Sequence, residues 1–229
     1  MRDPTHDSIS VWRDAVKDAE HPRHQTAWLM FSEGTKPKAA AKLLAARRDE
    51  VIPWLYEILD EPRLYKVDSL GVGYAPIHAI ELLGEWRVLE AAPRLLKIVV
   101  EDSGIDDGPT IAFDRACIAL ENFGVVPEIA ALIREYIADD RYRDSHDTLA
   151  SMLADNGKGD PESYDTIMTV FKRASAEHSV TYLAEALLIC DQQRAIDDLE
   201  SMLHSGRYSR AVRERLTQYI EDARAGNFP

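Results

Sequence analysis

Prolines that recur at nearly regular intervals are the feature that most constrains the fold of this chain. Seven of its 11 prolines stand just before or early in an apolar helical pattern, separated by 16, 23, 17, 16, 18 and 34 residues: Pro37, Pro53, Pro76, Pro93, Pro109, Pro127 and Pro161. Proline is tolerated in the first turn of a helix, where its missing N–H has no intrahelical acceptor, and it breaks a helix at later positions. Helix starts about 17 residues apart give helix pairs of roughly 35 residues, a repeat length typical of solenoids.

Apolar residues follow a helical period along the whole chain. In the stretch 88–101, positions 88, 89, 92, 95, 96 and 99 form one apolar stripe, which predicts Leu95 as a core residue and Arg94 as an exposed one. Leu132 is predicted to be core by the same pattern. No segment alternates with period 2 between turn signals, so we expect essentially no sheet. The predicted helices cover 8–20, 22–33, 37–47, 50–60, 75–85, 88–102, 109–123, 126–139, 144–156, 162–174, 178–190, 193–204 and 208–224.

These patterns predict an all-α fold, an α-solenoid of about five to six antiparallel helix pairs. No Gly/Ser linker interrupts the chain, so a single domain over residues 1–229 is expected. It comprises an N-terminal capping pair at 8–33, helix-pair repeats at 37–205 and a charged C-terminal capping helix at 208–224. Glycines stand where helices are expected to stop: Gly34, Gly84, Gly124, Gly157 and Gly206.

Three helix pairs within 37–140 resemble HEAT repeats, including the short HEAT-like units of phycobilin lyase subunits. The HEAT pattern has an alanine-rich first helix ending in Leu-Gly, then a second helix of the form Pro-x-Leu followed by an acidic residue. The matching stretches are 79–84 (AIELLG) with 92–96 (APRLL), 115–120 (RACIAL) with 124–129 (GVVPEI), and 39–44 (AAAKLL) with 51–55 (VIPWL). The resemblance implies a right-handed superhelical stack of helix pairs and brings no catalytic residues with it.

Two classes of HEAT-like enzyme are disfavoured by residue type. Deoxyhypusine hydroxylases hold di-iron through His-Glu dipeptides, and this chain contains none. HEAT-like alkylpurine DNA glycosylases need a cationic concave face, whereas the only dense basic stretch here, 207–215, is interleaved and followed by acidic residues. We therefore expect neither enzyme activity.

The charge balance bears on partners and location. The chain has 27 basic and 40 acidic side chains and a formal charge of −13, which disfavours nucleic-acid binding and favours a cationic protein partner. No apolar run approaches the ~18 residues of a membrane helix, and the first residues are acidic without an apolar leader segment. We therefore expect a cytoplasmic protein without membrane contact, and the sequence leaves its oligomeric state open.

Candidate metal and catalytic groups are few. His21 and His24, near Glu20 and His6, lack a convincing third and fourth zinc ligand. The acidic stretch 101–108 fits a calcium loop poorly, because Ile105 would fall on a ligand position. His78 is expected at the edge of its helix's apolar stripe, and Cys117 and Cys190 are expected as small buried residues. We predict no catalytic residues, no metal and no cofactor.

The connection 60–75 is the best candidate for a binding site, because it is much longer than a usual HEAT turn. Aromatic residues also gather nearby. The residues predicted to bind a partner are Trp54, Tyr56, Arg63, Leu64, Tyr65, Lys66, Leu70 and Tyr74. Two alternatives stay open: the N-terminal pair covers the aromatic residues, or the two tyrosines at 65 and 74 fold back and seal a gap between repeats.

The function predicted from these features is a non-catalytic protein-interaction scaffold or adaptor. Its partner would bind the second-helix face and the 60–75 loop. The alternative is a lyase-type or chaperone subunit that is active only within a complex, as the resemblance to phycobilin lyase repeats implies. A cofactor pocket beside the aromatic loop would favour the alternative, and a featureless acidic groove would favour the scaffold.

Overall fold

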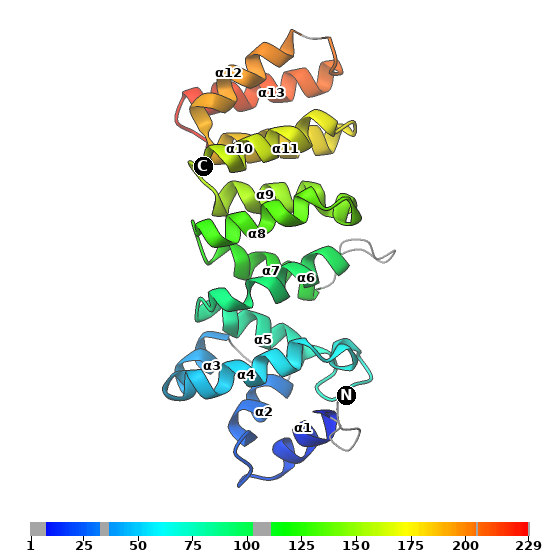
Figure 1. Cartoon of the computed structure of the whole chain (residues 1–229), viewed down its shortest axis with the longest axis vertical. Helices are drawn as coiled ribbons and strands as arrows, with labels where there is room; N and C mark the ends of the chain where they lie inside the picture. Colours follow the sequence, from blue (N-terminus) through cyan, green and yellow to red (C-terminus); the bar gives the residue numbers. More distant parts are fainter. Residues whose placement is uncertain (1–7, 33–36, 103–110, 205, 229) are drawn as a thin grey trace. The chain divides into compact units, whose positions relative to one another are not determined.

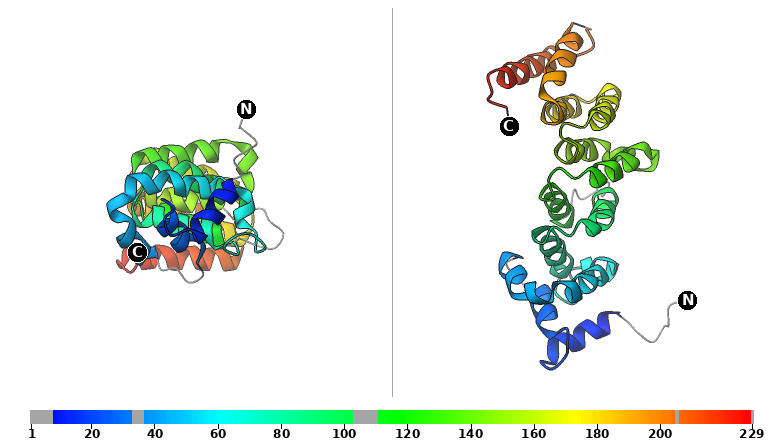
Figure 2. Two further views of the ribbon diagram at one scale, coloured as in Figure 1. Left: turned by 90° about the horizontal axis from the view of Figure 1, so that it is seen from below. Right: turned by 60° about the vertical axis from the view of Figure 1, so that its left-hand side comes forward.

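The chain is helical in the computed structural model, which describes residues 8–32, 37–102, 111–204 and 206–228. Within these ranges every regular element is a helix and no strand occurs (Figure 1). Figure 2 shows the same helices from two further sides. None of the described helices is long and apolar enough to cross a membrane. The chain divides into two compact units, Met1–Asn122 and Phe123–Pro229, and the expectation of one continuous domain stays a prediction.

The N-terminal unit is built around helix α5, on which α2, α3, α4 and α7 all pack. Helices α1 and α2 pair with each other, and α6 packs on α7. A helix with neighbours on several sides must be apolar around most of its circumference, and α5 buries residues on all but a narrow face. The α-helices are α1 (Ser8–Lys17), α2 (His24–Phe31), α3 (Pro37–Leu44), α4 (Arg48–Leu59), α5 (Tyr74–Glu85), α6 (Ala92–Asp102) and α7 (Ile111–Glu121). The short 3-10 helices are η1 (Ala45–Arg47), η2 (Pro62–Tyr65) and η3 (Leu89–Ala91).

In the C-terminal unit each helix contacts the next one along the chain, and α8, α9 and α11 also contact the next but one. Helix α9 contacts α8, α10 and α11, and α11 contacts α10, α12 and α13. The elements are α8 (Pro127–Ala138), the 3-10 helix η4 (Asp140–Ser145), α9 (His146–Asn156), α10 (Pro161–Arg173), α11 (Glu177–Cys190), α12 (Gln192–Leu203) and α13 (Arg210–Arg224). Every helix predicted from the sequence has a counterpart here or in the N-terminal unit.

Five of the seven prolines lie in a first helical turn, as predicted: Pro37, Pro76, Pro93, Pro127 and Pro161. Pro53 does not, because α4 begins at Arg48 and the proline is its sixth residue. Pro109 lies outside the described residues. Gly84 lies one residue before the end of α5 at Glu85, where that helix was predicted to stop.

Two core predictions need correction. Leu95 is fully buried as expected, but Leu132 is only half-buried, because the buried face of α8 runs through Ile129, Ile133 and Ile137. Arg94 is not a free exposed side chain either. It is half-buried and bonded to Asp60.

Candidate functional site

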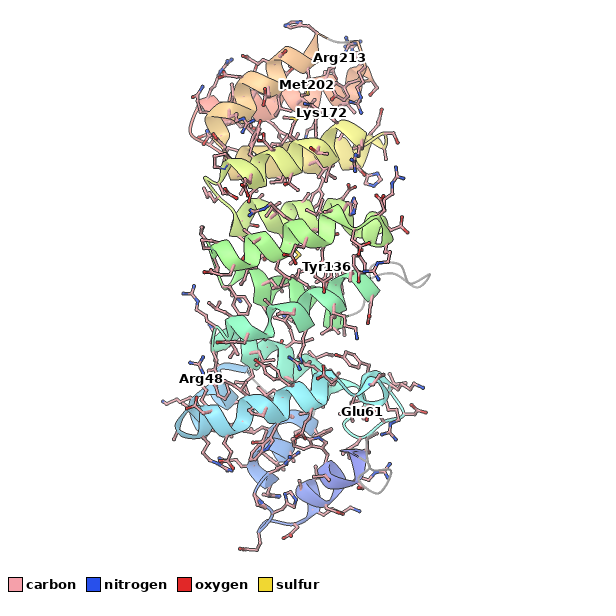
Figure 3. All side chains as sticks on the ribbon, in the orientation of Figure 1. Arg48, Glu61, Tyr136, Lys172, Met202 and Arg213 are labelled. Atoms are coloured by element: carbon pink, nitrogen blue, oxygen red, sulfur yellow. The ribbon has the colours of Figure 1, made fainter. Side chains whose placement is uncertain are left out.

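The connection between α4 and α5 is an ordered series of turns rather than a plain loop. Glu61, labelled in Figure 3, starts the 3-10 helix η2 by accepting a hydrogen bond from the backbone N–H of Arg63 at 3.2 Å. Three further backbone turns follow, from Ser69 N–H to Lys66, from Val72 N–H to Ser69, and from Tyr74 N–H to Gly71. The connection therefore holds its side chains in defined positions.

The prediction that Leu64 is an exposed binding residue is wrong. Leu64 is a core residue with 0% of its surface accessible. The 3-10 turn directs it inward. Tyr65 is half-buried, and its hydroxyl donates a hydrogen bond to the carbonyl oxygen of Leu59 at 3.1 Å. Part of the connection thus packs back on the end of α4, and the sealing of a gap between repeats by both tyrosines stays a prediction.

The Trp54 ring of α4 makes cation–π contacts with two arginines of the same chain. Arg23 lies 5.2 Å from the ring centroids of both Trp12 and Trp54, and it also pairs with Glu57. Arg47 lies 5.5 Å from the Trp54 centroid. These contacts fasten the turn between α1 and α2 to α4, so Trp54 serves the packing of the N-terminal helices.

An open cleft of about 890 Å³ lies beside the connection in the N-terminal unit. Its walls come from the end of α4, the connection itself, the first turns of α5, one face of α6 and the start of α7. Tyr65 and Tyr74 line it, and the other six predicted binding residues do not. The aliphatic side chains that line it are Leu59, Val67, Val72, Ile77, Ile98 and Ile111.

The sequence analysis missed these aliphatic residues, although one signal was available. Ile98 is an apolar residue on the face of α6 that also carries Arg94, Lys97 and Glu101. A single apolar side chain on a polar helix face is common, and it indicates a site only together with other exposed apolar residues. Val67 and Val72 carried no such signal, because the exposure of a loop residue depends on which distant segments pack against it.

The charged residues of the cleft are paired with one another. Arg94 donates from Nε to Oδ1 of Asp60 at 3.1 Å and from Nη2 to Oδ2 at 3.1 Å. Lys97 Nζ lies 3.7 Å from Glu101 Oε1. Arg94 also lies 4.2 Å from the ring centroid of Tyr56, whose pKa is raised mainly by burial and further by Glu90. Within the described part of the cleft lining, two positive and two negative groups balance.

The three described histidines of the N-terminal unit make hydrogen bonds within the chain. His78 is buried, contrary to the expectation of a position at the stripe edge, and its Nδ1 donates to the carbonyl oxygen of Met30 at 2.8 Å. His24 donates from Nδ1 to Ala15 at 2.8 Å, and His21 Nδ1 accepts from the backbone N–H of Arg23. These rings act as hydrogen-bonding groups of the fold.

No group of three or more His, Cys, Asp or Glu residues that could hold a metal is found in the described parts of the chain. His6 and most of the acidic stretch 101–108 lie outside those parts. The predictions on zinc, calcium and the absence of a metal therefore stay predictions.

The cysteine thiols are held in the protonated form. Burial raises the pKa of Cys117 to about 12, and the carboxylates of Glu121 and Asp114 add to the shift. Burial likewise raises the pKa of Cys190 to about 11. Cys190 is buried as expected, whereas Cys117 is half-buried. A nucleophilic or metal-binding thiol needs a lowered pKa, so neither cysteine has the environment of a reactive one.

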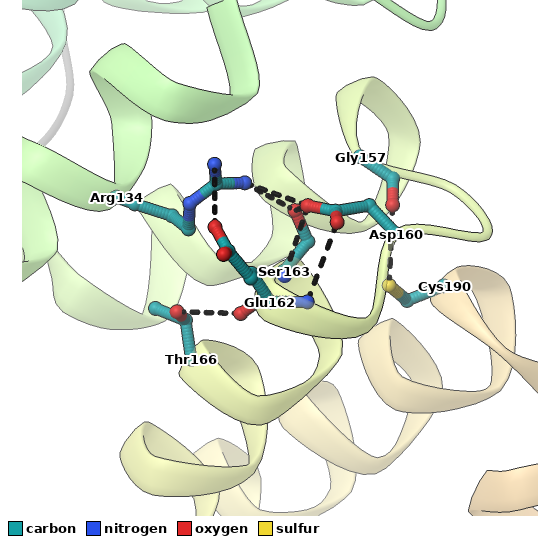
Figure 4. A network of polar contacts seen from close by, with 7 residues as sticks. All are labelled: Arg134, Gly157, Asp160, Glu162, Ser163, Thr166 and Cys190. Carbon is teal, nitrogen blue, oxygen red and sulfur yellow. Dashed lines mark hydrogen bonds and ion pairs between the residues drawn. The ribbon is translucent and has the colours of Figure 1, made fainter. Parts of the chain in front are cut away.

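A polar network in the C-terminal unit joins α8 to the start of α10 (Figure 4). Arg134 Nη1 lies 2.7 Å from Asp160 Oδ2 and 2.9 Å from the Ser163 hydroxyl, and it forms a second pair with Glu162. Ser163 donates to Asp160 at 2.6 Å, and this bond lowers the pKa of Asp160. Asp160 also accepts from two backbone N–H groups of α10, so the network is a helix N-cap secured by an arginine.

The comparisons with known proteins give no relative. No protein-family model matches the chain, and neither a curated protein nor a solved structure matches it. The inference of function therefore depends on the residues and geometry described above.

Proposed function

We propose that this chain is a non-catalytic interaction module, a HEAT-like stack of helix pairs that binds a segment of a protein partner in the cleft beside the 60–73 connection. The single observation that carries the proposal is that cleft, in which apolar side chains remain open to solvent. Val67 is 80% exposed, and Val72 and Ile111 are each 58% exposed. A cluster of exposed apolar residues with polar groups at its rim is typical of an interaction site.

The stack of helix pairs is supported by the packing within each unit. In the N-terminal unit α3 packs on α5 and α5 on α7, while in the C-terminal unit α9 packs on α11 and α11 on α13. Contacts between alternate helices are what a solenoid of helix pairs requires. Solenoids commonly bind partners along their extended surfaces, which agrees with the proposed role.

A pair of matched variants tests the proposal. Val67→Glu places a charge in the cleft, and Val125→Glu places one on an exposed valine of the C-terminal unit. Proteins captured from the native cell by the wild type and by Val125→Glu, but lost with Val67→Glu, are partner candidates. Each is then purified, and its affinity for the three forms is measured by calorimetry. The proposal fails if no purified protein distinguishes Val67→Glu from Val125→Glu.

The size of the cleft favours a second candidate, the lyase-type or chaperone subunit that works within a complex. A volume of about 890 Å³ lies within the range of small-molecule pockets. Native mass spectrometry of the complex from its own cell separates the two candidates. A small molecule bound to this chain at a constant stoichiometry supports the second candidate, and its absence from a complex with a bound protein segment supports the first.

A further inference from the structure

Val72 is held in a backbone conformation that valine rarely adopts. Its φ is 53°, and its neighbours Gly71 and Gly73 have φ of 77° and 82°, so three successive residues are left-handed. The left-handed region is unfavourable for a non-glycine residue, and a β-branched side chain makes it an outlier. A glycine at 72 would relieve this strain.

The two glycines have no room for a side chain, whereas position 72 does. A Cβ on Gly71 would come within 2.8 Å of Phe31 Cδ1, and one on Gly73 within 3.2 Å of the Tyr65 carbonyl oxygen. The Val72 side chain instead lines the cleft and is 58% exposed. Strain of this kind concentrates at functional sites, which indicates that the isopropyl group of Val72 is used by an occupant of the cleft.

The charges of the cleft lining indicate the net charge of the segment that binds there. Among the residues that the structure describes, both carboxylates of the lining have a basic partner: Asp60 pairs with Arg94, and Glu101 pairs with Lys97. The chain as a whole has a formal charge of −13, whereas the described residues of the lining carry no net charge. Charge complementarity therefore favours an uncharged occupant over the cationic partner expected from composition.

The volume of the cleft would admit a small molecule, but its exposed rim favours a polypeptide. Arg94 and Glu101 bound the α6 wall seven residues apart, which corresponds to about 10 Å, or two helical turns. Val67 is 80% exposed, so only an occupant that also covers the rim buries it. Resting on the proposed function of the cleft, we infer that the bound segment of the partner is apolar, carries no net charge and contacts Val67 and Val72.

One fluorescent dye and three competing peptides test the inference on the full chain. N-phenyl-1-naphthylamine, an uncharged apolar dye, reports occupation of the cleft. Its displacement is measured with three amphipathic helical peptides that share a Leu/Phe face and carry Gln, Lys or Glu on the other face. The variants are Val67→Ser and Val72→Gly in the cleft, with Val125→Ser as the matched exposed valine outside it.

The dye is expected to bind wild type and Val125→Ser equally, with a dissociation constant about ten-fold higher in each cleft variant. The Gln peptide should displace it at the lowest concentration. Val72→Gly should melt no lower than wild type, because it removes a strained conformation, so its loss of binding would not reflect unfolding.

Two results would overturn the inference, and they differ in their consequence. If the Lys or Glu peptide is the strongest competitor, the occupant is charged, and the cleft is still the binding site of the proposed function. If the dye fails to bind, or binds the cleft variants as it binds wild type, both the inference and the proposed site are wrong.

Discussion

Arg94 illustrates how a single residue on a polar helix face takes part in tertiary structure. Its guanidinium makes two hydrogen bonds to Asp60 and lies over the ring of Tyr56, so it joins α6 to α4. Partly exposed ion pairs contribute little, because water screens them and two long side chains must be ordered. We therefore expect Arg94 to matter for stability, but much less than the core residue beside it.

Three substitutions test this ranking. Leu95→Ala should lower the free energy of unfolding by about 2–5 kcal/mol, through lost burial and a cavity. Leu132→Ala should cost less because Leu132 is half-buried, and Arg94→Ala about 0.5–1 kcal/mol. Urea unfolding followed by circular dichroism measures each difference. Equal costs for Leu95→Ala and Arg94→Ala would show that the burial of Leu95 is wrongly described.

The raised pKa values of the two thiols predict how stability and thiol reactivity depend on pH. Cys117 has a pKa of about 12 in the folded chain, above the value near 9 of an unperturbed thiol, so the unfolded chain loses this proton first as pH rises. Its contribution to stability is complete below pH 9 and is lost as pH rises towards 12. At pH 8.5, iodoacetamide should modify Cys117 and Cys190 far more slowly in native protein than in urea. Rapid native labelling of either residue, located by mass spectrometry, would contradict the raised values.

At the scale of elements, Gly84 determines how closely two helices approach. A Cβ at this position would lie 2.9 Å from the Cβ of Ala119, so α5 and α7 pack at a distance that only glycine allows. Helix propensity favours alanine over glycine by about 1 kcal/mol, whereas overpacking costs roughly 1–3 kcal/mol. The two effects have opposite signs, and the packing effect should prevail.

Gly84→Ala is therefore expected to destabilise the chain. Adding Ala119→Gly should reopen space between the helices, so the double variant should recover part of the lost free energy of unfolding. Urea unfolding of the four members of this cycle gives the coupling between the two positions. Stabilisation by Gly84→Ala alone would mean that α5 and α7 do not pack as closely as described.

At the scale of the whole molecule, each unit has its own network of neighbouring helices. Helix α5 is the centre of the N-terminal unit, and α9 and α11 hold the same place in the C-terminal one. If the chain is a solenoid, its stability is a sum of local contributions from each pair and its neighbours. A core substitution should then act mainly on helices near it.

Hydrogen exchange measures this distribution. Leu95→Ala should accelerate exchange in α5, α6 and α7 far more than in α11 to α13, and Leu183→Ala, which also removes a fully buried side chain, should do the reverse. Mass spectrometry of peptic fragments resolves the two regions. Equal acceleration along the whole chain by either variant would show a single cooperative unit and count against the solenoid.

The sequence by itself determined most helix starts, since proline is favoured in a first helical turn, as at 37, 127 and 161, and Pro53 inside α4 is the exception. It also determined the all-helical class, because helical periodicity is a local property. Tertiary structure decided the site. Leu64 and Val67 are both apolar residues of one connection, yet the first is buried and the second exposed, because burial depends on what α4 and α5 bring against each. The cleft likewise joins Val72 to Ile98 and Ile111, which no local pattern connects.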